Sequence, residues 1–86
     1  MRVHEFMVNH TLEREDLMAI SQKAARFTAD IILKFQFSDV EHSVDVKSLL
    51  GIMLLPIHQG VTVRLETKGK DELEALEFVL PLLEKR

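Results

Sequence analysis

The feature of this sequence that most constrains its fold is an alternation of apolar and polar residues on both sides of the dipeptide Ser38-Asp39. Alternation with a period of two indicates β-strands that bury one face, and a two-residue polar break between two such runs indicates a β-hairpin. We therefore predict a hairpin over residues 29–46. Its buried face is expected to contain Ile31, Leu33, Phe35, Phe37, Val40, Val44 and Val46.

Two more segments alternate in the same way and predict two further strands. One covers residues 60–67, and the other, with a weaker pattern, covers residues 3–8. The residues expected on their buried faces are His4, Phe6, Val8, Val61, Val63 and Leu65. Polar residues at the alternate positions predict that the opposite sheet face is solvated, and they include Lys34, Gln36, Glu41, Ser43, Arg64 and Glu66.

Apolar residues spaced three and four positions apart predict helices between the strands. The first helix is expected to begin at Thr11, because threonine is a common N-cap. A short second helix is expected from Ser48 to Leu54, ending before Pro56. The first helix has an acidic first turn and an apolar stripe, which are formed by Glu13, Glu15 and Asp16 and by Leu17, Ile20, Ala24 and Phe27.

The last predicted helix begins at Asp71, which has Glu74 at the spacing of a capping box. Pro81 lies inside this segment, and because proline removes a helical hydrogen bond we expect a kink or an early end there. Together these elements predict an α+β fold. It is an open-faced β-sandwich of order βαββαβα, in which a four-stranded antiparallel sheet carries three helices on one face.

Composition narrows the functional classes. The 86 residues suit a single domain over residues 1–86, and the net charge of −3 argues against direct binding of nucleic acid. The chain has no cysteine, and its four histidines lack the spacing of metal ligands, so we expect no metal. It has no nucleotide-binding loop, no segment long enough to insert into a membrane and no clear nucleophile–base pair. We therefore expect a cytoplasmic protein that is not an enzyme and has no cofactor.

Two of the histidines fall on predicted strands. His4 and His42 share parity with apolar neighbours, so we expect both to be partly buried and hydrogen-bonded.

The segment around Ser48 is the strongest candidate for a functional site. Ser48 precedes a short apolar helix, where unpaired N–H groups would stabilise a phosphate on its hydroxyl. The apolar residues after it cannot all face one core, so some are expected to form a docking surface. A serine here is also an ordinary N-cap worth about 1 kcal/mol, and the residues alone leave both interpretations open. The candidate docking residues are Lys47, Leu49, Leu50, Ile52 and Met53.

Four segments taken together resemble the HPr family, the small phosphocarrier proteins of the bacterial sugar phosphotransferase system (PTS). The segments are RFTADI at residues 26–31, VKSLLGIM at residues 46–53, Gln59-Gly60, and GKDE at residues 69–72. The resemblance covers nearly the whole chain, and it implies the family's βαββαβα open-faced sandwich.

The family has two phosphorylation sites, and the resemblance carries over only one of them. Ser48 matches the serine that an ATP-dependent HPr kinase modifies. Alignment backward from Phe27 without gaps places Glu13 at the position of the family's phosphate-accepting histidine, and Glu15 and Asp16 replace its arginine and proline. Carboxylates at this helix start would repel a phosphate, so no histidine phosphotransfer is expected.

The resemblance thus implies a Crh-like regulatory protein of sugar transport and carbon catabolite repression. Its expected partners are an HPr kinase/phosphorylase, which would act on Ser48, and a LacI-type transcriptional regulator. Lys47 would assist recognition by either partner. Two alternatives remain: a phosphocarrier that uses a displaced His10, or a diverged HPr-fold interaction domain in which Ser48 is only a cap. The oligomeric state, a monomer or a homodimer formed by strand exchange, is also open.

Overall fold

The computed structural model has the expected order of elements and describes residues 1–53 and 59–84. The expectations for Leu54, Pro56, His58 and the side chain of Phe37 lie outside the described residues. In chain order the elements are β1 (Arg2–Met7), α1 (Arg14–Ala24), β2 (Asp30–Phe37), β3 (Val40–Asp45), α2 (Leu49–Met53), β4 (Thr62–Lys68) and α3 (Glu72–Glu84).

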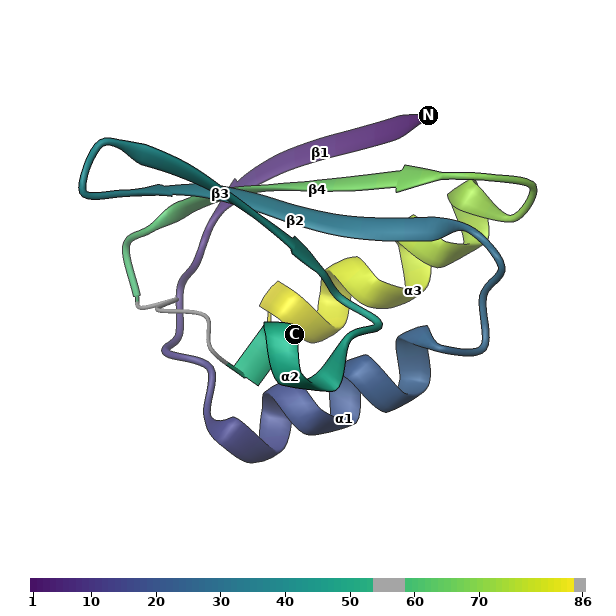
Figure 1. The fold of residues 1–86 in the computed structure, drawn as a ribbon, viewed down its shortest axis with the longest axis horizontal. Helices are drawn as coiled ribbons and strands as arrows, with labels where there is room; N and C mark the ends of the chain where they lie inside the picture. Colours follow the sequence, from purple (N-terminus) through teal and green to yellow (C-terminus); the bar gives the residue numbers. More distant parts are fainter. Residues whose placement is uncertain (54–58, 85–86) are drawn as a thin grey trace.

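The strands form one antiparallel sheet in the order β1-β4-β2-β3, and α1, α2 and α3 all lie on the same side of it (Figure 1). The predicted hairpin is confirmed, with Phe37 paired to Val40 across the turn. Ser38 and Asp39 have φ angles of 54° and 63°. Positive φ at both central residues is the type I′ geometry, whose twist matches that of the strands it joins.

The core lies between the sheet and the helices, as the alternation predicted. Ile31, Leu33 and Leu65 are fully buried, and they belong to one apolar cluster with Leu17 and Ile20 from the predicted stripe of α1. Predicted buried positions at the sheet margins are more exposed. Val40 has 56% of its surface accessible, because the tip of the β2–β3 hairpin extends beyond the helical layer (Figure 1). His4 is exposed on the edge strand β1, so its predicted partial burial is wrong.

The predicted cap of α1 is also wrong. The helix begins after Glu13, whose backbone N–H donates to the Asp16 carboxylate at 3.1 Å. Thr11 instead uses its hydroxyl oxygen to accept a hydrogen bond from the Gln59 backbone N–H at 3.4 Å. The threonine therefore connects two loops instead of starting a helix.

Asp71 precedes α3, but its carboxylate joins two distant parts of the chain. It accepts hydrogen bonds from the Thr28 N–H at 3.0 Å, the Thr28 hydroxyl at 3.1 Å and the Ala29 N–H at 2.8 Å. The Thr28 backbone N–H is the main cause that lowers the pKa of Asp71. The helix itself continues through Pro81 to Glu84, so the early end considered for this segment does not occur.

Candidate functional site

Ser48 lies between β3 and α2 and caps the short helix, as predicted. Its Oγ accepts a hydrogen bond from the Gly51 N–H at 3.3 Å, and its carbonyl oxygen accepts one from the Ile52 N–H at 2.9 Å. Ser48 is nevertheless exposed. The hydroxyl is therefore held in a defined position on the surface.

The turn that presents Ser48 is fixed by the residues before it. The Asp45 carboxylate accepts a hydrogen bond from the Lys47 N–H at 2.9 Å, and the Asp45 carbonyl accepts one from the Ser48 N–H at 3.0 Å. Between them Val46 is fully buried and donates its N–H to the carbonyl of Ile31 at 2.9 Å. The serine thus follows a segment that is anchored in the core.

Lys47 is only partly exposed, and its ammonium group donates to the Phe27 carbonyl at 3.2 Å. Phe27 follows the C-terminal end of α1, and its own N–H donates to the Ala24 carbonyl at 3.2 Å. The lysine therefore links the Ser48 turn to the segment that joins α1 and β2.

The apolar residues of α2 divide into a core group and a surface group. Ile52 is fully buried and Met53 packs partly against the core. Leu49 and Leu50 are 41% and 74% exposed. The expectation that the Ile52 side chain belongs to a docking surface is wrong, because that side chain faces the core. Ser48, Leu49 and Leu50 are called the α2 surface below.

The start of α1 is acidic. Glu13 and Glu15 are exposed, and Asp16 is engaged with the Glu13 backbone. His10 is exposed and lies two residues before the buried Leu12; its Nδ1 is 2.7 Å from the carbonyl oxygen of Asn9. Three carboxylates and one imidazole therefore fall within residues 10–16, around the beginning of α1.

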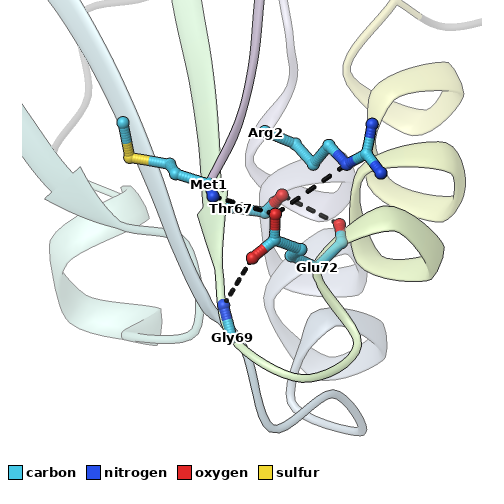
Figure 2. Close-up of polar contacts among 5 residues, drawn as sticks. All are labelled: Met1, Arg2, Thr67, Gly69 and Glu72. Carbon is cyan, nitrogen blue, oxygen red and sulfur yellow. Dashed lines mark hydrogen bonds and ion pairs between the residues drawn. The ribbon is translucent and has the colours of Figure 1, made fainter.

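A polar cluster at the start of α3 was not found by the sequence reasoning (Figure 2). The Glu72 carboxylate lies 2.9 Å from the α-amino group of Met1 and 3.8 Å from Arg2 Nε, and it accepts the Gly69 N–H at 3.1 Å. The hydroxyl of the fully buried Thr67 donates to the Glu72 carbonyl at 2.8 Å. The N-terminal ammonium is the main cause that lowers the pKa of Glu72. The cluster fixes the beginning of β1 against α3.

Within residues 1–53 and 59–84, no group of three or more His, Cys, Asp or Glu side chains is arranged to hold a metal ion. In the same part of the chain, no helix has the length and apolar character needed to cross a membrane. His42, which was expected to be partly buried, is half-buried and stacks on Phe35 with ring centroids 5.4 Å apart.

Fold and site together define a small α+β protein whose sheet carries all its helices on one face and which presents a capped, exposed serine after its third strand. The family model described as "PTS HPr component phosphorylation site" matches residues 16–85. This chain belongs to the HPr family. Its members named HPr are phosphocarrier proteins and not classical enzymes.

Two curated relatives and one solved structure show the range of the family. The HPr-like protein Crh of Halalkalibacterium halodurans is 39% identical over 64 residues, which are 74% of this chain and 71% of the relative. The phosphocarrier protein HPr of Cupriavidus necator is 36% identical over 66 residues, which are 77% and 74%. The crystal structure of Bacillus subtilis Crh has a TM-score of 0.71 at 29% identity over 99% of this chain and 93% of that one. It is described as an intertwined dimer with a swapping domain.

Proposed function

We propose that this chain is an HPr-like regulatory protein of the phosphotransferase and carbon catabolite control system, and that its regulated residue is Ser48. An HPr kinase would transfer the γ-phosphoryl group of ATP to Ser48 Oγ, with loss of the hydroxyl proton and release of ADP. The observation that carries the proposal is the position of Ser48, which is exposed yet held at the start of α2 by its bond to Gly51.

The neighbours of Ser48 support a role in recognition. A phosphate would add about −1.5 to −2 charges beside Leu49 and Leu50. The α2 surface would then carry negative charge beside its apolar side chains. A regulator of LacI type with a complementary cationic and apolar surface would bind the phosphorylated form in preference to the unmodified form. Lys47, bonded to Phe27, would hold the modified turn in place while Met53 supports it from the core side.

The acidic start of α1 supports the second part of the proposal, the absence of histidine phosphotransfer. We assign Glu13 to the position of the family's active histidine. A phosphorylated group there would lie close to Glu15 and Asp16, and each close pair of like charges costs on the order of 1 kcal/mol even in water.

Incubation of the purified chain with an HPr kinase and ATP tests the role of Ser48. Mass spectrometry should find one added phosphate, which is absent from the Ser48→Ala variant. The matched control is Ser43→Ala, which removes an exposed serine from β3. If this chain stays unmodified under conditions that fully modify an authentic HPr, the regulatory proposal is overturned. The remaining alternative is then an HPr-fold interaction domain in which Ser48 is only a cap.

The phosphocarrier alternative has its own test, because His10 is exposed. Incubation with enzyme I and phosphoenolpyruvate should leave the chain unmodified. An acid-labile phosphate that disappears in His10→Ala would establish the alternative.

The oligomeric state belongs to the same proposal. The dimeric Crh structure, with its swapping domain, supports a homodimer as the alternative to a monomer. Sedimentation of the unmodified chain over a range of concentrations decides between the two states.

A further inference from the structure

The two edge strands of the sheet differ in the side chains they present to solvent. On the face away from the helices, β3 presents only polar residues, among them two carboxylates. On that same face β1 presents Val3, Glu5 and Met7, here called the β1 odd row, and Val3 and Met7 are 48% and 64% exposed. Native proteins usually protect sheet edges with charged side chains. By this criterion the β3 edge is protected, whereas the outer face of β1 has Glu5 alone.

The backbone of the β1 odd row points to the open edge. The Val8 N–H donates to the Val61 carbonyl at 2.8 Å, so residues at even positions along this ladder bond to β4. The N–H and C=O groups at the odd positions therefore point away from β4. Because β1 is the terminal strand of the sheet, no strand in the described part of the chain pairs with them.

This edge is held in its paired conformation at both ends. Met1 pairs with Glu72 at the start of the strand (Figure 2), and Phe6 and Val8 are buried in the core at its end. A partner strand would therefore add to a preformed template, which lowers the ordering cost of binding.

The charge of Glu5 determines which kind of strand can pair with the open edge of β1. On the β4 side, Glu5 is already paired in register with Arg64. A second copy of this chain, paired antiparallel so that Val3 meets Met7, would place Glu5 opposite its own counterpart, and like charges directly opposite are destabilising. A strand with a basic residue opposite Glu5 and apolar residues on either side would complement all three positions.

We propose that the open edge of β1 is a docking site for an extended segment of a partner protein in which apolar, basic and apolar residues follow one another at every second position. The segment would add a fifth strand to the sheet by backbone hydrogen bonds. The site is separate from the α2 surface, so it does not depend on the modification of Ser48.

The probe is the acetylated and amidated peptide Thr-Val-Thr-Arg-Thr-Val-Thr, titrated into the ¹⁵N-labelled full chain and followed by NMR. We expect saturable shifts of the amides of the β1 odd row. A peptide with Glu in place of Arg should bind at least about threefold more weakly, because an opposite-charge pair becomes a like-charge pair. Glu5→Lys should reverse this order, and the matched control Glu41→Lys on β3 should preserve it. If the lysine variant does not fold, Glu5→Gln should remove the difference between the peptides.

Three results would overturn the proposal. The first is a set of shifts confined to the α2 surface or to the hollow on the outer sheet face, whose lining includes Lys34 and Arg64. The second is peptide discrimination that Glu5→Lys leaves unchanged. The third is a dimer of the chain alone whose odd-row amides are protected from exchange, because it would make the second copy the occupant.

Discussion

Ile52 and Leu50 stand two positions apart on α2, yet the first is fully buried and the second is 74% exposed. Ile52→Ala removes three carbon atoms from the core. At about 0.8 kcal/mol per buried methylene, the lost transfer free energy is about 2.4 kcal/mol. The cavity that remains raises the expected loss of unfolding free energy to about 3–4 kcal/mol. Domains of this size have a total stability of about 4–13 kcal/mol, so the loss is a large share.

Leu50→Ala is the matched variant, and its free energy of unfolding should change by less than about 0.5 kcal/mol. Urea unfolding followed by circular dichroism measures both variants, with the m value expected to stay constant. In thermal unfolding, Ile52→Ala should lower Tm by about 12–32 °C at about 4–8 °C per kcal/mol. If the two variants lose similar stability, or Ile52→Ala loses less than about 1 kcal/mol, the division of α2 into a core side and a surface side is refuted.

Three further predictions concern turns and acid stability. Gly69→Ala should lower Tm more than Gly60→Ala. A Cβ at Gly69 would lie 2.7 Å from the Ala29 Cα, whereas a Cβ at Gly60 would have no neighbour within 4 Å in the described part of the chain. Equal losses would contradict the close approach. Asp39→Gly should raise the unfolding free energy by up to about 1 kcal/mol, because glycine adopts the φ of 63° with less strain; a loss in urea unfolding would argue against the type I′ turn. The pKa of Asp71 is lowered from 3.8 in the folded state, so its carboxylate stabilises the fold above that value and loses this contribution as pH falls through the folded pKa. In an acid titration followed by circular dichroism, Asp71→Asn should therefore show a shallower loss of stability than the parent chain.

The strands were predictable because alternation reports directly which side chains face the core. Ile31, Leu33 and Leu65 all lie where their parity placed them. The helix caps were less predictable, since a capping side chain can bond to distant groups instead of its own helix. Asp71 bonds to Thr28, which lies 43 positions earlier, and nothing in the local sequence around Asp71 indicates that partner.

The candidate site shows the same division between local and distant information. Ser48 was identified as a cap from its position before an apolar segment, and its bond to Gly51 agrees. Periodicity failed to separate Ile52 from Leu50, because a helix of five residues is too short to define one face. The pairing of Glu72 with the N-terminal ammonium was missed for another reason: it depends on β1 lying beside β4, which is a property of the whole topology.

The pairing of β1 with β4 also has a consequence for the order in which the protein forms. The register joins Arg2 to Thr67, so among the described strands β1 pairs with β4, which is synthesised after β2 and β3. At about 5–20 residues per second, a ribosome needs about 3–13 s to make the segment between Arg2 and Thr67. During that time β1 has no strand to pair with, and both of its edges are open. Closing so long a loop slows folding, and the nascent strand is exposed to association for as long as the loop remains open.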